Sequence, residues 1–267
     1  MTSVGFVGPG RMGRPMVDRL LQAGHDVTVL ARREEVAVDL AAAGARVVST
    51  PADAARGASV VVVCLFSDDQ LLEVADDLLS GLGDGAVMAS HVTGRRSTVQ
   101  DLGARAADVG AHVVDAPVSG GVDEINTGRL TVLLGGEASA VDKADAVVAA
   151  YGDPRIRTGA LGSALAVKLV NNLLFATHSQ TAAAALQLGE KLGVEQQALL
   201  QVLDTASGRS FASSSLARTG SAEAWAQVIG EFLRKDVAAC EAELAAAGAD
   251  GGLLVDVVHR GPLRLAD

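Results

Sequence analysis

The stretch 162–193, GSALAVKLVNNLLFATHSQTAAAALQLGEKLG, predicts one continuous helix, far longer than the usual ~11 to 12 residues. At ~1.5 Å per residue, a helix of about 30 residues spans roughly 45 Å, which is enough to run from one domain into another. The sequence before this stretch alternates between short apolar runs and helical patterns, whereas the sequence after it contains helical patterns only. We therefore expect the long helix to join two domains of different kinds.

A lysine lies among the apolar side chains of this helix. With ~100° per residue, two apolar flanks are separated by a row of mainly polar positions. The flanks are Leu165, Leu169, Leu173 and Val167, Val170, Leu174, and the row between them contains Lys168, Asn172, Phe175 and Ser179. An unpaired ammonium is costly to bury. Lys168 is therefore either a solvated charge on a helix edge or a working group in a cleft, and the residues alone leave both interpretations open.

The composition excludes several classes of protein. The 267 residues suit two medium domains, and 22 basic against 32 acidic residues give a net charge of −10, which argues against nucleic-acid binding. Cys64 and Cys240 offer neither a disulfide framework nor metal-ligand spacing, so we expect no metal and a reducing cytoplasm. The start lacks a signal-peptide pattern, and polar residues interrupt 169–189 too often for a membrane span.

A glycine motif opens the first domain. Gly8-Pro9-Gly10-Arg11-Met12-Gly13 lies between an apolar run at Val4–Val7 and a helical pattern that ends at Gly24, and a second apolar run follows at Val27–Leu30. In a G-x-G-x-x-G motif placed this way, the glycines allow a tight turn, close approach to a pyrophosphate, and close packing of helix on strand. The helix N-terminus then faces the phosphates. We expect residues 8–13 to bind a dinucleotide.

The same alternation continues through the first domain. Further strands are expected at Val47-Val48, Val60–Leu65, Val87–Ser90, His112–Val114 and Leu130–Leu134. Helices are expected at Glu34–Ala43, at a short segment that starts at Thr50-Pro51, from a cap at Ser67 or Asp68 through Leu79, at Ser97–Val109 and at Glu137–Tyr151. Alternating strands and helices indicate an α/β fold with a parallel sheet covered on both faces. We predict a Rossmann-type doubly wound domain over residues 1–161.

Ligands of such sheets bind beyond the carboxyl ends of the strands. The candidate contacts there are Leu65, Phe66, Ser67, Thr93 and the loop Asp115–Gly121, DAPVSGG. Ser67 is more simply a helix cap, whereas Thr93 suits capping and ligand contact equally. In the DAPVSGG loop, the hydroxyl of Ser119 and the N–H groups of Gly120 and Gly121 could hold a carboxylate. A plain turn would need the same glycines.

The second half of the chain predicts an all-α domain over residues 162–267, beginning with the long helix 162–193. Apolar residues at helical spacing occur at Gln196–Leu203, Ala222–Gly248 and Leu253–Val258, and Gly208 and the serine-rich 210–215 are expected to form a loop. Lys235-Asp236 is more simply a solvated pair, but it could also direct a second cation into a cleft.

Four motifs in a fixed order resemble the β-hydroxyacid dehydrogenase family, which includes 3-hydroxyisobutyrate dehydrogenase and the tartronate, glyoxylate and succinic semialdehyde reductases. The motifs are GFVGPGRMG at 5–13, DAPVSGG at 115–121, KLVNN at 168–172 and Lys235-Asp236, so the resemblance covers nearly the whole chain. It implies an enzyme that transfers a hydride between a nicotinamide and a short β-hydroxy acid. It also implies a homodimer or homotetramer formed through the helical domain.

The resemblance assigns a role to each matching residue. The dinucleotide would be bound by Gly8, Gly10 and Gly13, and the substrate carboxylate by Ser119, Gly120 and Gly121. Lys168 would act as the catalytic acid/base. Asn172 would orient the substrate, and Lys235 would close the site. Imine reductases, which share this two-domain plan, usually carry another residue, often Asp or Tyr, in place of the lysine. A non-catalytic nucleotide-binding relative would tend to have lost it. Lys168 and Asn172 therefore favour the dehydrogenase.

Two departures from the family pattern affect the expected site. Glu124 and Ile125 stand where the family usually has small residues, which changes the size and polarity expected of the substrate pocket. The sequence also ends at Asp267, where family members usually continue into a further helix. That difference could reduce the C-terminal side of the cleft or the oligomer contact.

The residues after the second strand predict NADP(H) rather than NAD(H) as cofactor. NAD-binding folds place an acid about 20 residues beyond the glycine motif, to accept from the ribose 2′-hydroxyl. The sequence there is Leu30-Ala31-Arg32-Arg33, with no acid. A guanidinium can hold a 2′-phosphate through paired hydrogen bonds. The alternative is that Arg32 and Arg33 are solvated beside Glu34 and Glu35.

Overall fold

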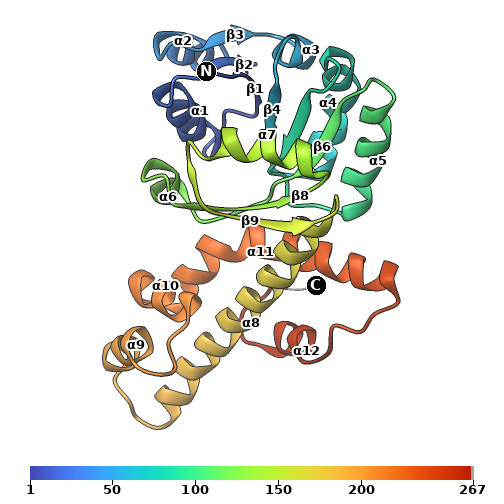
Figure 1. Cartoon of the computed structure of the whole chain (residues 1–267). Helices are drawn as coiled ribbons and strands as arrows, with labels where there is room; N and C mark the ends of the chain where they lie inside the picture. The colour runs from blue at the N-terminus through green and yellow to red at the C-terminus, as the bar shows by residue number, and fades with distance from the viewer. Residues whose placement is uncertain (266–267) are drawn as a thin grey trace. The chain divides into compact units, whose positions relative to one another are not determined.

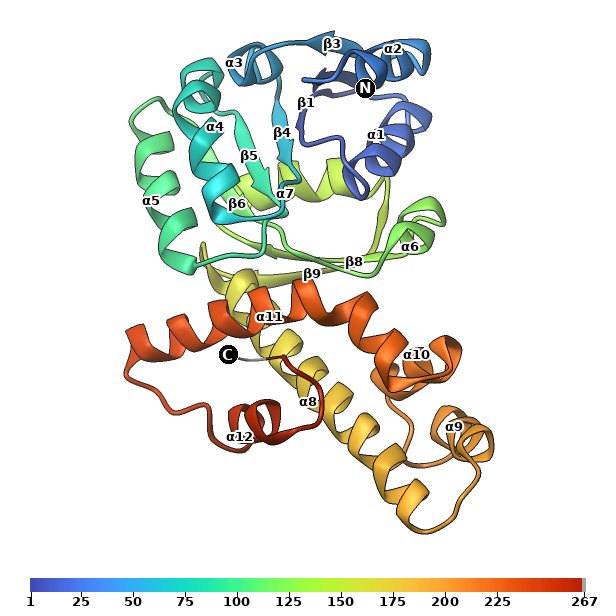
Figure 2. The same cartoon turned by 180° about the vertical axis from the view of Figure 1, so that it is seen from behind.

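The computed structural model describes residues 1–265 and separates into two compact units, Met1–Lys168 (the sheet unit) and Leu169–Asp267 (the helical unit). Figure 1 shows the sheet of the first and the helices of the second, and Figure 2 shows both from behind. The predicted long helix is confirmed as α8 (Ser163–Lys191). The boundary between the units lies inside this helix. A domain boundary at the start of the helix, between residues 161 and 162, stays a prediction.

The sheet unit is built on nine strands. Eight follow the order β3-β2-β1-β4-β5-β6-β8-β7, and β9 pairs with β8. The strands are β1 (Ser3–Val7), β2 (Asp26–Leu30), β3 (Arg46–Val48), β4 (Val60–Val63), β5 (Val87–Ser90), β6 (His112–Asp115), β7 (Val118–Ser119), β8 (Leu130–Gly135) and β9 (Gly152–Gly159). Strands β1 to β6 are parallel, as predicted for a doubly wound sheet.

The far edge of the sheet differs from the prediction. Strand β8 runs antiparallel to β6 and β7 and parallel to β9. A parallel return requires a long crossover connection, usually a helix that packs across the sheet. Between β6 and β8 the chain forms only the two-residue strand β7 and the short helix α6 (Val122–Asn126), so β8 returns in the opposite direction. The sheet is therefore mixed at this edge.

Helices cover both faces of the sheet (Figure 1). They are α1 (Gly13–Gln22), α2 (Glu34–Ala42), α3 (Pro51–Ala55), α4 (Asp68–Gly81), α5 (Arg96–Ala107) and α7 (Ala138–Val148). Along β4, Val60 and Val62 belong to the core beneath α1 and α7, and Val61 and Val63 to the core beneath α3, α4 and α5. Successive side chains of a strand point to opposite faces, so an unbroken run of valines fits a central strand buried on both sides.

The helical unit consists of most of α8 together with α9 (Gln196–Thr205), α10 (Phe211–Thr219), α11 (Ala222–Ala247) and α12 (Gly252–Arg260). The prediction of a loop at 210–215 was wrong, because α10 covers most of that stretch. The Ser210 hydroxyl accepts from the Ser213 N–H and starts the helix. Ser213, Ser214 and Ser215 are buried, since their small side chains allow α10 to pack closely.

The two apolar flanks predicted for α8 have different surroundings. Leu169 and Leu173 are buried in the core of the helical unit, whereas Val170 and Leu174 are 59% and 41% exposed. One flank therefore supports the fold, and the other is a free apolar surface within this chain.

Candidate functional site

The glycine motif forms the tight turn expected from the sequence. Gly8 has a φ of +93°, and a Cβ there would lie 2.2 Å from the carbonyl oxygen of Cys64. A Cβ on Gly13 would lie 2.1 Å from the carbonyl oxygen of Gly8, whereas one on Gly10 would meet no atom within 4 Å. Gly8 and Gly13 are thus fixed by the turn and by packing. Gly10 leaves open space above the backbone, where a ligand can approach.

The start of α1 is suited to an anion. No acidic residue occupies its first turn, and its N-cap residue, Met12, makes no side-chain capping bond. The N–H groups there can therefore bind phosphate oxygens. Arg11, next to Met12, is exposed.

A pocket of about 260 Å³ joins the glycine motif to the arginines after β2. It is lined by Val7, Gly8, Pro9, Gly10, Leu30, Ala31, Arg32, Arg33, Val36, Leu65, Gln70 and Glu73. Arg33 forms an ion pair with Glu35 at 3.2 Å between two largely exposed side chains, as in the solvated alternative. Arg32 is exposed on the same wall. Arg32 is therefore the better placed of the two for a ligand phosphate.

The other predicted contacts follow β4 and β5. Leu65 lines the pocket described above, and Phe66 is 50% exposed with its N–H donating to the side chain of Gln70. Ser67 caps α4 by accepting from the Gln70 N–H, which confirms the simpler interpretation of this residue. Thr93 is half-buried in the loop after β5. These positions lie at the carboxyl ends of neighbouring parallel strands.

Asp115, the first residue of the DAPVSGG loop, ties that loop to α8. Its buried carboxylate accepts from the N–H groups of Gly162 and Leu165, each at 2.8 Å. Burial raises the pKa of Asp115, and these backbone hydrogen bonds oppose the shift. The carboxylate thus satisfies free N–H groups at the start of the helix that carries Lys168.

His91 joins the loop after β5 to the loop after β6. Its Nδ1 is hydrogen-bonded to the carbonyl oxygen of Ala116, and its Nε2 lies 2.8 Å from the hydroxyl of Tyr151. Both rings are buried. Burial lowers the pKa of His91 to about 4, so the imidazole is neutral at physiological pH. It therefore acts as a fixed hydrogen-bonding link between the Thr93 loop and the DAPVSGG loop.

One of the three residues predicted to bind the substrate carboxylate already donates a hydrogen bond within the protein. The Gly121 N–H donates to Oε2 of Glu124 at 2.7 Å, so the chain's own carboxylate occupies that amide. Ser119 belongs to β7 and is half-buried, and Gly120 is exposed with a φ of +132°. Glu124, identified from the sequence only as a departure from the family pattern, is therefore a neighbour of the predicted binding loop.

Lys168 is only 8% exposed, which rules out the interpretation of a solvated charge on a helix edge. Asn172 lies one turn further along α8 and is also buried. Side chains four residues apart share one face of a helix, so α8 presents the ammonium and the amide together.

Asn172 belongs to a polar network in the helical unit. Its amide donates to Oδ2 of Asp236, and Nζ of Lys235 lies 2.8 Å from Oδ1 of the same carboxylate. The expectation that Lys235-Asp236 is a solvated pair was wrong, because the side chain of Asp236 is only 6% exposed. A buried carboxylate is costly unless it is paired, and here one amide and one ammonium provide the partners.

Three residues of these networks were missed as site residues: His91, Asp115 and Asp236. Asp115 and Asp236 lie inside the DAPVSGG and Lys235-Asp236 motifs, and His91 directly follows the apolar run that ends at Ser90. A buried position for a polar residue is the signal that could have identified them.

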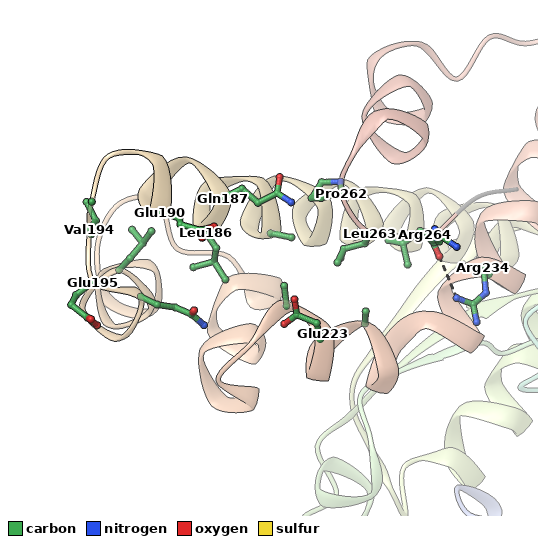
Figure 3. A pocket seen from close by; sticks show the side chains of 17 residues that line it. Leu186, Gln187, Glu190, Val194, Glu195, Glu223, Arg234, Pro262, Leu263 and Arg264 are labelled. Carbon is green, nitrogen blue, oxygen red and sulfur yellow. Dashed lines mark hydrogen bonds between the residues drawn. The ribbon is translucent and has the colours of Figure 1, made fainter.

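A pocket of about 870 Å³, larger than the one at the glycine motif, lies within the helical unit, between the C-terminal part of α8, the starts of α9 and α11, and residues 262–265 (Figure 3). Glu190, Glu195 and Glu223 line it together with Arg234 and Arg264. Its lining includes none of the predicted site residues among those that the structure describes. Size alone therefore does not identify the candidate active site.

No cluster of three or more His, Cys, Asp or Glu side chains within residues 1–265 could hold a metal ion. Over the same residues, no helix has both the length and the apolar composition needed to cross a bilayer.

The fold and the glycine loop define a dinucleotide-binding α/β protein with a helical second unit. Residues 3–172 match the NAD-binding domain of 6-phosphogluconate dehydrogenase, and residues 162–257 match the NAD-binding family of NADP-dependent 3-hydroxyisobutyrate dehydrogenase. The chain therefore belongs to the β-hydroxyacid dehydrogenase family.

Individual relatives agree with this assignment. Mitochondrial 3-hydroxyisobutyrate dehydrogenase of Rattus norvegicus is 32% identical over 215 residues, which are 79% of this chain but 64% of the rat protein. NAD-dependent L-serine dehydrogenase of Pseudomonas aeruginosa is 33% identical over 79% of this chain and 72% of its own length. The solved structure of Mycobacterium tuberculosis 3-hydroxyisobutyrate dehydrogenase with L-serine is 28% identical, with a TM-score of 0.86 over 97% of this chain and 92% of that one.

Proposed function

We propose that the protein is an oxidoreductase that transfers a hydride between NADP(H) and a short β-hydroxy acid or its semialdehyde. The observation that carries this proposal is the burial of Lys168, 8% exposed and one helical turn from Asn172, in a chain of this family. Buried ionisable groups are frequent at functional sites, and Lys168 and Asn172 both belong to the KLVNN motif that carries the resemblance to this family.

In this reaction the bound nicotinamide would accept the hydride when the alcohol is oxidised and donate it when the semialdehyde is reduced. When an alcohol is oxidised, the hydride leaves the carbinol carbon, and Lys168 accepts the proton of the hydroxyl group. When a semialdehyde is reduced, Lys168 donates a proton to the developing alkoxide. General acid–base catalysis of this kind contributes ~10² to 10⁴ in rate.

The remaining predicted residues orient the substrate. Ser119 and the Gly120 N–H would bind the substrate carboxylate next to Gly121, and Asn172 would hydrogen-bond the substrate. Asp236 fixes both Asn172 and Lys235, since it accepts from the first and pairs with the second. Lys235 would then add a positive charge near an acidic substrate.

The proposed cofactor is NADP(H), bound through the glycine motif, Leu65, Phe66 and Thr93, with Arg32 on the 2′-phosphate. The shared pocket of Gly8, Gly10 and Arg32 supports this assignment. The expected domains, 1–161 for the cofactor and 162–267 for the substrate, belong to the same proposal, as does a cytoplasmic location. A homodimer or homotetramer is supported by the exposed flank of α8, with Val170 59% exposed.

The named relatives support a hydroxymethyl compound as substrate. The rat and Pseudomonas aeruginosa relatives are named for 3-hydroxyisobutyrate and L-serine. Each of these acids has a primary alcohol on a carbon next to the one that bears a carboxylate.

The test is a panel of short β-hydroxy acids, the matching semialdehydes and cyclic imines, assayed with NADP(H) and NAD(H). We expect turnover of at least one acid–semialdehyde pair and a preference for NADP(H). Arg32→Ala should raise KM for NADP(H) by roughly 10- to 100-fold, because charge-assisted hydrogen bonds contribute ~1.5 to 3 kcal/mol. A preference for NAD(H) would contradict the cofactor assignment, and turnover of imines alone would replace the proposed reaction.

A further inference from the structure

The carboxylate of Glu124 lies against the loop that is proposed to bind the substrate. Glu124 is the third residue of α6, and its Oε2 accepts from the Gly121 N–H at 2.7 Å. Its Cβ and Cγ lie 3.2 Å from the position that a Cβ on Gly120 would take. The side chain therefore folds back over the start of α6 and covers the glycines.

The loop keeps unused donors beside this carboxylate. Across residues 1–265, neither the Ser119 hydroxyl nor the Gly120 N–H has a hydrogen-bond partner, and Oε1 of Glu124 has none either. Ser119 and Gly120 are only partly buried or exposed, so a ligand can reach them. The loop thus offers two donors and one carboxylate oxygen within six residues of sequence.

A simple anion does not match this arrangement. The Cα atoms of consecutive residues are ~3.8 Å apart. A ligand carboxylate that accepts from the Gly120 N–H would therefore lie within a few ångströms of the Glu124 carboxylate, which accepts from the Gly121 N–H. Two like charges at ~4 Å weaken binding by roughly 5-fold in bulk water and by nearly 1000-fold near a protein surface. A ligand that also carries a positive charge would replace this repulsion with an ion pair.

We propose that Glu124 determines specificity and selects β-hydroxy acids that carry an ammonium group next to the carboxylate, that is, β-hydroxy-α-amino acids. The ligand carboxylate accepts from Ser119 and Gly120, and its ammonium donates to Oε1 of Glu124. This inference rests on the proposed function, because it names the substrate class of the same site. The reaction is unchanged: the hydride leaves the β-carbon for the nicotinamide, and the hydroxyl proton goes to Lys168.

Two compounds that differ only in the ammonium group test the proposal: L-serine and 3-hydroxypropionate. The variant is Glu124→Gln, which keeps an acceptor for the Gly121 N–H but removes the charge. The control is Asp123→Asn, which makes the same change of net charge at the exposed neighbouring position. Circular dichroism and melting temperature confirm that each variant folds like the wild type.

For the wild type, kcat/KM should be higher for L-serine than for 3-hydroxypropionate. In Glu124→Gln the ratio of the two values should fall by roughly 10- to 100-fold, the range expected for a charge-assisted hydrogen bond. Asp123→Asn should change the ratio by less than about 3-fold, as expected for a solvated charge. A wild type that prefers 3-hydroxypropionate, or a ratio unchanged by Glu124→Gln, would overturn the proposal.

Binding separates this proposal from the proposed reaction. Calorimetric titration of both compounds, with NADP⁺ present, measures recognition without turnover. If neither compound reacts but L-serine binds more tightly in the wild type and loses this advantage in Glu124→Gln, the proposed reaction fails and the role of Glu124 stands. If both compounds react and bind with equal affinity in both proteins, the role of Glu124 fails and the reaction stands.

Discussion

The candidate binding groups are mainly main-chain groups in the sheet unit and side chains in the helical unit. In the sheet unit the glycine loop offers mainly main-chain groups, and the absence of side chains at Gly8, Gly10 and Gly13 shapes the space. In the helical unit the candidate groups are the side chains of Asn172, Lys235 and Asp236, which are held by one another.

This difference explains why the two regions differ in how readily they are predicted. The main-chain site is formed by one continuous motif, and Gly13 meets the backbone of Gly8 in the same turn. Only the contact of Gly8 with Cys64, at the end of β4, comes from a distant part of the sequence. The side-chain network joins α8 to α11, and only tertiary packing brings those helices together. The expected effects of substitution differ accordingly.

The largest effect should come from Lys168→Ala. Loss of a general acid–base should lower kcat by ~10² to 10⁴ while cofactor binding is retained. Stopped-flow turnover and fluorescence titration of NADPH measure the two quantities. Lys191→Ala, which removes an exposed lysine near the end of the same helix, is the control. A Lys168→Ala protein with a tenth of wild-type turnover would remove Lys168 from the mechanism.

The main-chain character of the glycine loop can be tested by comparing Gly8→Ala with Gly10→Ala. At Gly8 a methyl group meets a carbonyl oxygen at 2.2 Å with φ at +93°, so the variant should lose roughly 2 to 5 kcal/mol of unfolding free energy. At Gly10 the methyl group has free space, so stability should be kept while cofactor affinity falls. Urea unfolding and NADPH titration distinguish the two. Equal stability of both variants would contradict the structural roles assigned to these glycines.

A smaller effect concerns His91 and pH. The unfolded imidazole binds a proton below about pH 6.5, whereas burial lowers the folded-state pKa to about 4. Between these values the unfolded state binds more protons, so stability is full above pH 6.5 and falls as pH falls toward 4. At ~1.4 kcal/mol per pH unit, this amounts to roughly 3 kcal/mol. Urea unfolding from pH 7 to 4 should show a flatter dependence in His91→Gln, and identical slopes would refute the assignment.

The smallest effect is expected in the helical unit. Asp236→Asn removes the charge that pairs with Lys235 and disturbs the bond to Asn172, so the free energy of unfolding should fall by about 1 to 2 kcal/mol. Glu231→Gln, an exposed position on the same helix, should change it by less than about 0.5 kcal/mol. Thermal and urea unfolding measure both variants. If the two lose equal stability, the network contributes nothing beyond an ordinary surface charge.

Two elements that the sequence did not predict show where local patterns fail. Strand β9, Gly152–Gly159, is rich in charged residues, and Arg155 and Arg157 pair with carboxylates of the preceding helix α7. It is a strand because β8 offers an edge to pair with, which no local pattern indicates. Helix α10 was not predicted either, because serine-rich stretches usually indicate loops. In the structure, Ser213 is buried and donates to the carbonyl oxygen of Leu203, a contact that depends on tertiary packing.

The sequence by itself determined the alternation of strands and helices through the parallel part of the sheet, β1 to β6, together with the glycine turn, the long helix and the family. These features depend on periodicity, glycine sterics and motifs that are local in the chain. Tertiary structure alone decided that Lys168 is buried, that Asp236 holds Asn172 and Lys235, that Asp115 caps α8, and that Glu124 occupies the Gly121 amide. Burial and hydrogen bonding depend on which segments meet in space, so a polar residue in the sequence identifies a candidate but not its partner.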